Sequence, residues 1–377
     1  MKQTRCIVLT FVLTFGLAMA AALLFDVWDS NAQVYPWPQA DTYDDRTDST
    51  WASSDVYTYY VYLPAVNKPP MTQPGVWTLE YQAEPQHRLW EVDALSEEDV
   101  WAVGGWCCNP SISLIAHFDG QNWQEVDHPG NDQLFALDMF SSDLGWAAGQ
   151  FGELLQYENG QWTRMTSPVS TDFNIDDLTV SSASNVWAVA NAGASCQGNW
   201  KARILHFNGT NWDVTDDYYG VQFKTVNFIA ENVGYVGGYR TSDYEQFGPI
   251  LLKFQNGNWV EMSSPSSGGL KAVDFSDANN GWILSTNEVF RYDDGRWQNY
   301  ECAFCWGAYA IDTSSSFLKW MSGYNFLGYL QADTWHQVST PGTDVIFEDI
   351  DILPSGVGWA VGWDMGNEYR GMILHHQ

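Results

Sequence analysis

The sequence is poor in positive charge. It has 16 Lys and Arg residues against 46 Asp and Glu residues, so its 377 residues carry a formal net charge of −30. So few cations cannot neutralise many phosphates, which excludes nucleic acid as the main partner and also electrostatic docking on anionic lipid. The aromatic content is 16%, with 21 Trp, which is too high for a disordered acidic chain.

Long apolar runs are also scarce. Only residues 6–25 approach the length that spans a bilayer, which excludes a polytopic membrane protein. Two basic residues precede this run, as in a secretory signal. We expect residues 1–32 to be a signal peptide, cleaved after Ala32 or after Ala20, or a retained N-terminal membrane anchor. Either alternative makes the rest of the chain secreted or otherwise extracytoplasmic.

A polar stretch follows this segment. Residues 33–74 are rich in Asp, Ser, Thr, Tyr and Pro, and residues 41–48 contain nothing that could form a core. One strand could form over residues 56–63. We expect a flexible linker that tethers the folded domain, residues 75–377, to the wall or the membrane.

From residue 75 onwards, one motif recurs seven times. Each unit has an apolar strand, a step that carries Trp, a second apolar strand, a Gly-containing turn and a Trp that opens a last strand. The first Trp position is occupied by Trp101, Trp146, Trp187, Tyr235, Trp282, Trp320 and Trp359. The second is occupied by Trp77, Trp123, Trp162, Trp212, Trp259, Trp297 and Trp335.

The period and the turns of this motif predict the fold class. The unit length is about 43 residues, and Asn-Gly or Asp-Gly pairs, which suit type I′ hairpin turns, precede five of the second-position Trp. Four short strands at this period predict an all-β, seven-bladed β-propeller of four-stranded antiparallel blades. The repeated Trp then fill gaps between twisted sheets, so we interpret them as packing residues rather than sugar platforms.

The two ends of the repeat region complement each other. The seventh unit stops at its third strand, whereas residues 75–81 have the form of a fourth strand with no strands before it. We expect this N-terminal strand to complete the last blade. That pairing closes the ring and leaves no open sheet edge.

The unit from Leu270 to Trp282 contains Leu-Lys-Ala-Val-Asp-Phe-Ser-Asp and, three residues later, Gly-Trp. It resembles the repeat of the photosystem II stability/assembly-factor propellers and of the bacterial-neuraminidase-repeat (BNR, Asp-box) group. The resemblance covers residues 75–377 as a repeat pattern. It implies the propeller fold and a role in photosynthetic assembly, and the enzyme nearest to this family is a sialidase-like glycosidase.

One face of the expected ring is the candidate binding face. The loops from each second to third strand, and the connections between blades, open on the same side. Four of these loops are long, at residues 104–113, 190–201, 238–249 and 362–371, and such loops on a rigid scaffold often bind ligands. Their aromatic residues are the candidate ligand-binding residues Trp106, Trp200, Tyr239, Tyr244, Trp363 and Tyr369. The alternative is that these side chains only cover their own loops.

Five cysteines follow the N-terminal segment, and all are expected on that face. In an exported protein they are more typical of disulfides than of metal ligands. We expect a local disulfide between Cys302 and Cys305, and a vicinal bridge between Cys107 and Cys108 is possible but strained. One thiol is left over. A zinc site is disfavoured because these two pairs would be nearly half a ring apart.

Eight residues before each first-position Trp, the innermost strand carries a polar residue between apolar neighbours. The series is Asp93, Asp138, Thr179, Asn227, Asp274, Asp312 and Asp351. Buried polar groups need partners, so we expect each one to bond to local backbone amides. The alternative is that five carboxylates lean into the central channel, where they raise one another's pKa or hold a cation such as Ca²⁺.

These features favour a binding protein over an enzyme. A sialidase-like site would need an arginine cluster and a Tyr/Glu pair, and the arginines of the repeats show no convergent triad. No hydrolase elbow, zinc-protease motif or phosphate loop occurs. We predict a non-catalytic extracytoplasmic propeller that recognises a glycan or an envelope protein, without a cofactor. A sialidase-like glycoside hydrolase with carboxylates near the axis is the alternative.

Overall fold

The computed structural model describes residues 75–107, 111–192, 200–242, 245–313 and 318–377, without the side chains of residues 242–247. The chain divides into two units, Met1–Pro74 and Gly75–Gln377. In the first unit the description covers only the backbone of β1 (Ile7–Thr10) and β2 (Thr58–Val61), which pair as an antiparallel ribbon. Within the described residues, no helix combines the length and the apolar character needed to cross a membrane.

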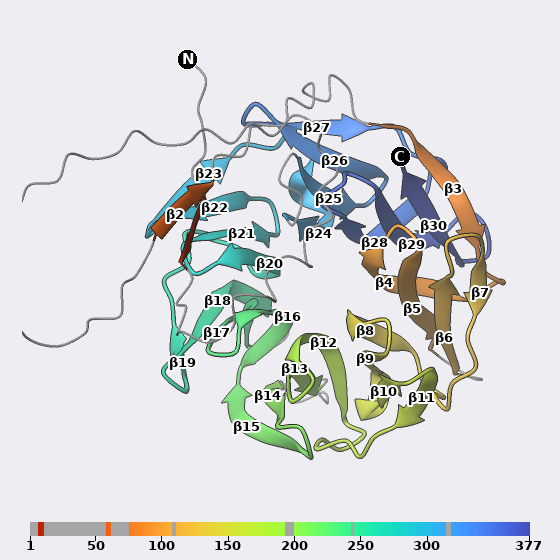
Figure 1. The fold of residues 1–377 in the computed structure, drawn as a ribbon, viewed down its shortest axis with the longest axis horizontal. Coiled ribbons are helices and arrows are strands. Elements are labelled where there is room, and N and C mark those ends of the chain that lie inside the picture. Colours follow the sequence, from red (N-terminus) through yellow and green to blue (C-terminus); the bar gives the residue numbers. More distant parts are fainter. Residues whose placement is uncertain are drawn as a thin grey trace, which may run out of the picture. The chain divides into compact units, whose positions relative to one another are not determined.

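The second unit is the predicted seven-bladed β-propeller, with seven four-stranded antiparallel sheets around a central axis (Figure 1). The innermost strand of each blade contacts the innermost strands of both neighbouring blades. From the axis outwards, blades 1 to 3 consist of β4 (Arg88–Ser96), β5 (Asp99–Trp106), β6 (Ile112–Phe118) and β7 (Trp123–Glu125); β8 (Leu134–Ser141), β9 (Leu144–Gly149), β10 (Leu154–Glu158) and β11 (Gln161–Arg164); and β12 (Phe173–Ser182), β13 (Asn185–Ala192), β14 (Lys201–Phe207) and β15 (Trp212–Tyr219).

Blades 4 to 7 repeat this order. They consist of β16 (Val221–Ala230), β17 (Val233–Ser242), β18 (Glu245–Gln255) and β19 (Asn258–Glu261); β20 (Leu270–Asp277), β21 (Asn280–Ser285), β22 (Val289–Asp293) and β23 (Arg296–Tyr300); β24 (Ala308–Asp312), β25 (Lys319–Gly323), β26 (Phe326–Gln331) and β27 (Thr334–Val338); and β28 (Val345–Ile352), β29 (Gly358–Asp364), β30 (Arg370–His376) and β3 (Trp77–Gln82).

Ring closure follows the prediction, because β3 is the fourth strand of blade 7. Trp77 pairs with His376 in the β3–β30 ladder. The Glu80 carboxylate accepts hydrogen bonds from the indole Nε1 of Trp123 at 3.1 Å and of Trp359 at 3.2 Å, and it lies 3.2 Å from the Nδ1 atom of His375. Burial raises the pKa of Glu80, but these hydrogen bonds outweigh burial and hold it below its ordinary value. Glu80 therefore joins β3 to blades 1 and 7.

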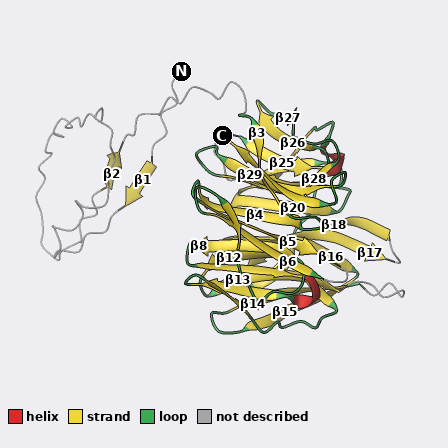
Figure 2. Cartoon of the chain, turned by 90° about the vertical axis from the view of Figure 1, so that its right-hand side faces the viewer, coloured by secondary structure: helices red, strands yellow, loops and turns green. Residues whose placement is uncertain are grey.

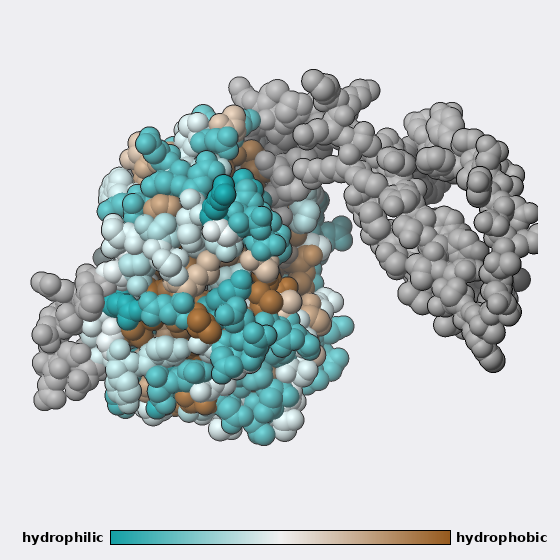
Figure 3. Space-filling view, turned by 90° about the vertical axis from the view of Figure 1, so that its left-hand side faces the viewer, coloured by the Kyte–Doolittle hydropathy of each residue, from teal (hydrophilic) through white to brown (hydrophobic). Residues whose placement is uncertain are grey.

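The hydrophobic core lies between the blades. The seven first-position aromatics are at most 6% exposed. The first-position Trp of one blade packs edge-to-face on the second-position Trp of the next, with ring centroids 5.3 to 6.1 Å apart, in Trp101–Trp162, Trp146–Trp212, Trp187–Trp259, Trp282–Trp335 and Trp320–Trp77. These rings pack neighbouring blades together, as interpreted from the sequence. The side of the ring seen in Figure 3 is largely hydrophilic, with apolar side chains in small groups.

The outer hairpin turns only partly follow the prediction. Asn159-Gly160, Asn256-Gly257 and Asp294-Gly295 have positive φ at both residues, as a type I′ turn requires. At Asp119-Gly120 and Asn208-Gly209 the type I′ prediction is wrong, because the loops contain four residues and Phe118 pairs with Trp123. There the Asx side chain accepts backbone N–H groups two and three residues ahead, which stabilises the longer loop.

The second-to-third-strand loops and the blade-to-blade connections open on one side of the ring, which we call the mouth face. The 3₁₀ turns η1 (Gln150–Gly152) and η2 (Cys305–Gly307) both lie on this side, and the β17–β18 hairpin projects from it (Figure 2). The long loops are shorter than expected because strand pairing extends into them. Trp106, Tyr239 and Trp363 are therefore strand residues, paired with Ile112, Pro249 and Gly371.

Candidate functional site

Each innermost strand contains a β-bulge near its start, on the side of the mouth face. In β4, for example, the pairing shifts between Leu89 and Glu91. A bulge leaves one residue without a partner opposite and re-aims its side chain. The bulge residues, which we call the bulge ring, are Trp90, Phe135, Asp176, Lys224, Lys271, Tyr309 and Glu348.

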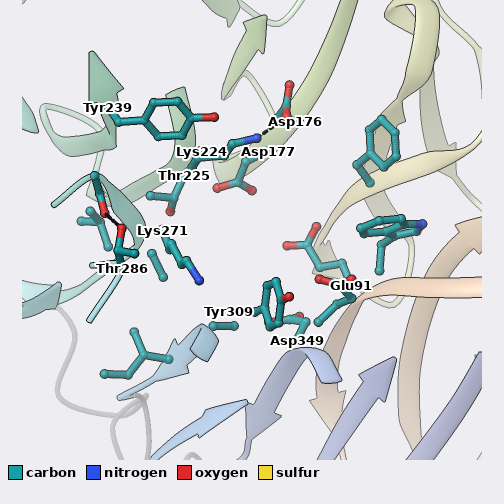
Figure 4. Close-up of a pocket in the computed structure, with 18 of the residues that line it drawn as sticks. Glu91, Asp176, Asp177, Lys224, Thr225, Tyr239, Lys271, Thr286, Tyr309 and Asp349 are labelled. Carbon is teal, nitrogen blue, oxygen red and sulfur yellow. Dashed lines mark hydrogen bonds and ion pairs between the residues drawn. The ribbon is translucent and has the colours of Figure 1, made fainter. Parts of the chain in front are cut away.

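All seven bulge residues line one cavity of about 610 Å³ (Figure 4). This volume is in the range of pockets that bind small molecules. Glu91, Asp177 and Asp349 also line it, each directly after a bulge residue, and we call them the throat carboxylates. Sequence reasoning missed both groups, although each bulge residue lies three positions before the repeated polar residue of its strand.

The two lysines of the bulge ring are bonded to the cavity wall. Lys224 Nζ lies 3.2 Å from Asp176 Oδ1. Lys271 Nζ donates to the carbonyl of Ala308 at 2.9 Å and lies 4.9 Å from the centroid of the Tyr309 ring. Burial lowers the pKa of Lys271. Burial is the largest single influence on Lys224 and acts to lower its pKa, but the charge and hydrogen bond of Asp176, together with Tyr239 and Glu348, outweigh burial and leave the pKa above its ordinary value.

The throat carboxylates each accept a backbone hydrogen bond from the next blade. The bonds join Glu91 Oε2 to Leu137 N at 2.8 Å, Asp177 Oδ2 to Val226 N at 2.7 Å and Asp349 Oδ2 to Val92 N at 3.0 Å. Burial raises the pKa of Asp177 to about 8 and that of Asp349 to about 6. The pKa of Glu91 is raised well above its ordinary value, first by burial and then by the charges of Asp177 and Asp349. The three groups therefore share one space.

The repeated polar residues lie deeper in the same strands and also bridge blades. The bonds join Asp93 to Met139 N, Asp138 to Val180 N, Asn227 to Phe275 N, Asp274 to Thr313 N, Asp312 to Ile352 N and Asp351 to Ala94 N, at 2.5 to 3.0 Å. The expectation of local amides is thus wrong, because each acceptor reaches the next blade. We call this series the inner ring.

Two details complete the inner ring. Thr179 hydrogen-bonds to Asp138, and the junction from blade 3 to blade 4 is bridged by the throat carboxylate Asp177. Burial raises the pKa of Asp93 and Asp351. The charge of Asp138 raises the pKa of Asp93 further, and that of Asp312 raises the pKa of Asp351 further.

In the described part of the chain, no group of three or more His, Cys, Asp or Glu could hold a metal ion.

Three of the predicted aromatic residues surround an arginine. The Arg88 guanidinium carbon lies 4.5 Å from the ring centroid of Trp106, 3.9 Å from that of Trp363 and 4.9 Å from that of Tyr369. The indole of Trp363 donates to Glu348 Oε1 at 3.0 Å. Burial raises the pKa of Glu348 to about 7, although the Trp363 bond and the Arg88 charge act against burial. These rings thus hold a cation of the protein itself.

The other predicted aromatic residues are dispersed. Tyr239 lines the cavity and its hydroxyl bonds to Gln222. Trp200 is half-buried immediately before β14, the third strand of blade 3, and Tyr244 lies outside the described residues. Exposed aromatics that the sequence analysis did not select also lie on the mouth face, at Phe151, Tyr219 and Trp306, which are 48%, 70% and 64% exposed.

The expected local disulfide is present. Cys302 and Cys305 are bonded, with their Cα atoms 5.5 Å apart, immediately before Trp306 on the mouth face. Cys108 and Cys196 lie outside the described residues. The vicinal bridge between Cys107 and Cys108 stays a prediction.

No protein-family model and no curated protein matches the sequence. Solved structures similar to the chain include the WD40 propeller domain of Doa1, at 12% identity and a TM-score of 0.58 over 80% of this chain and 97% of that one. YCF48 bound to D1 peptide is 15% identical, with a TM-score of 0.59 over 81% and 98%. YCF48 from Cyanidioschyzon merolae is 13% identical, with a TM-score of 0.56 over 80% and 99%. This likeness supports the propeller fold, and the Asp-box resemblance is not confirmed.

Proposed function

We propose that the protein is a non-catalytic binding propeller that holds a peptide segment of a protein partner at the mouth of its central channel. The bulge ring carries this proposal. Seven blades direct one side chain each into a single cavity, and these side chains include aromatic, acidic and basic groups. Recognition sites combine such apolar walls with a few placed polar groups. The exposed aromatics of the mouth face extend the surface that a peptide could contact.

The comparison structures support a peptide as the ligand by analogy. YCF48 has been solved with D1 peptide bound, and its propeller resembles this one in fold. The analogy concerns the scaffold, because function is determined by the residues of a site. We place the protein outside the cytoplasm, since residues 1–32 have the pattern of an export signal and the Cys302–Cys305 disulfide suits an oxidising compartment.

The inner ring weighs against the glycosidase alternative. Its carboxylates accept backbone hydrogen bonds from the next blade, so they already have a structural role. The mouth cavity is instead lined by the bulge ring and the throat carboxylates. A glycan remains the alternative ligand of that pocket, and a glycan array with the purified domain separates it from a peptide.

Site-specific photo-crosslinking tests the proposed function. Phe135 in the bulge ring and Phe140 at the other end of β8 offer a matched pair, because both are phenylalanines of one strand. We replace each in turn with benzoylphenylalanine and irradiate cells that produce the full chain. We expect discrete adducts with a protein partner from position 135 and not from position 140. Adducts from neither position, or equally from both, would contradict binding at the mouth.

A further inference from the structure

The throat carboxylates have no cationic partner among the residues that the structure describes. They come from blades 1, 3 and 7. Each is half-buried and lines the cavity. Among the described residues, no ion pair joins Glu91, Asp177 or Asp349 to a lysine or arginine. Asp177 and Asp349 act on Glu91 as like charges. Three acids therefore face one space without a counter-ion from the described part of the chain.

The nearby cations are already bonded elsewhere. Lys224 pairs with Asp176, and Lys271 donates to a backbone carbonyl and lies over Tyr309. Arg88 is enclosed by Trp106, Trp363 and Tyr369. The remaining acid of the bulge ring, Glu348, accepts the Trp363 indole. With two lysines against five acidic residues, the lining keeps a negative formal charge.

The wall next to Glu91 suits the stem of a long basic side chain. Trp90 and Phe135 pack edge-to-face with ring centroids 5.5 Å apart, and both line the cavity. Methylene groups of lysine or arginine pack on such rings, and their charged ends are attracted to ring faces and to carboxylates. Figure 4 shows Glu91 and Asp349 together on one wall of the cavity, and Lys224 and Asp177 on the other.

We infer that the mouth cavity binds a lysine or arginine side chain of the partner peptide, with its cationic group on the throat carboxylates. This inference rests on the proposed function and names the chemistry of its ligand. A carboxylate offers about four acceptor positions, and the backbone amides use only part of them. A bound cation also relieves the repulsion among the three acids, and the net charge of −30 favours the approach of basic partners.

Two short probe peptides test this inference with the purified full chain. We compare acetyl-Gly-Gly-Lys-Gly-Gly-amide with the same peptide carrying norleucine in place of lysine, by calorimetry at millimolar concentration. We expect the lysine peptide to bind about tenfold more tightly, and high salt to reduce the difference because ions screen the charges. Equal binding of the two peptides, or no binding of either, overturns the inference. So does preference for a glutamate peptide, which would place an anion on Lys224 and Lys271.

Matched variants locate the cation. Glu91→Gln keeps an oxygen for the amide of Leu137 and removes the charge, whereas Glu97→Gln makes the same change on the opposite face of blade 1, where Glu97 is exposed. We expect about a tenfold loss for Glu91→Gln and none for Glu97→Gln, with Asp349→Asn as a second throat variant. If Glu91→Gln and Asp349→Asn both fold and leave the affinity unchanged, the inference is wrong. Crosslinks from position 135 would then show that peptide binding at the mouth still holds, and their absence would reject both.

Discussion

The inner ring and the bulge ring lie three residues apart in the same seven strands, yet they differ in almost every respect. The inner ring has five Asp, one Asn and one Thr, and six of these residues accept a backbone amide of the next blade. The bulge ring has Trp, Phe, Asp, two Lys, Tyr and Glu, all facing a cavity. In a chain of repeats, a position that keeps one chemistry serves the scaffold. A position that changes from repeat to repeat is free to specify a ligand.

The largest expected effect is the loss of an inner-ring acceptor. Asp351→Ala leaves the N–H group of Ala94 without its partner at the junction of blades 7 and 1. An unsatisfied buried amide costs about 1–3 kcal/mol, so we expect the free energy of unfolding to fall by that amount in urea titrations. Lys271→Met, in the bulge ring, should cost less, because removing a partly buried charge offsets part of the lost hydrogen bond to Ala308. A reversed order of the two variants would break the distinction between the rings.

The pH dependence of stability sharpens the same comparison. The pKa is about 7 for Glu348 and about 8 for Asp177 in the folded protein, above the ordinary values of 4.5 and 3.8. The folded state therefore binds these protons more tightly than the unfolded state, and stability falls as pH rises towards and through the folded values. We expect a lower urea midpoint at pH 9.0 than at pH 7.5, because both values lie above the ordinary histidine pKa of about 6.5 and the carboxyl groups then dominate the change.

A variant shows whether the cavity acids cause this trend. Asp177→Asn removes one group whose pKa is raised by burial, so its midpoint should depend less on pH. His128, His206 and His376, which are at least partly buried, have lowered pKa values and act in the opposite direction, but mainly at and below the ordinary histidine pKa of about 6.5. A wild-type midpoint that rises from the lower to the higher pH would contradict the assignment.

The smallest expected effect concerns the support of the bulge ring. Arg88→Ala removes the cation from between Trp106, Trp363 and Tyr369, and a cation–π contact of this kind contributes about 0.5–2 kcal/mol. We expect a loss near the lower end, together with a changed near-ultraviolet circular dichroism signal from the indoles. Arg88→Lys keeps the charge but not the planar stacking. Its free energy of unfolding should therefore lie between those of the wild type and Arg88→Ala. An unchanged spectrum for Arg88→Ala would show that the rings hold their positions without it.

The fold could be predicted from the sequence because its signals are local and repeated. The Trp positions, three of the five Asn-Gly or Asp-Gly turns, and the missing fourth strand near Leu374 each follow from a few neighbouring residues. The sequence also shows the inner ring as a repeated polar position, but it does not show which backbone amides these residues bond to. Asp93 could bond to amides of its own blade or, as it does, to Met139 of blade 2. Which of these occurs depends on how the twisted sheets are placed around the axis, and the sequence alone does not show that.

The candidate site was harder to predict for the same reason. A bulge is a shift in pairing between two strands, so Trp90 or Lys271 cannot be recognised as a cavity residue before the register is known. The aromatic residues that drew attention instead, Trp106 and Trp363, lie in strands and enclose Arg88. Their residue type made them candidates from the sequence. Their partner Arg88 is apparent only in the structure, where blade 1 packs beside blade 7.

The pairing of β3 with β30 has a consequence for biosynthesis. The strand that finishes the last blade, β3, is synthesised before blades 1 to 6, whereas its partner β30 ends only at His376. Blades 1 to 6 can pair their own strands as they emerge, but blade 7 must wait for a contact that spans nearly the entire domain, and such distant contacts form slowly. Until then two sheet edges remain available to other chains. Newly made protein should therefore remain prone to aggregation until β30 has been synthesised.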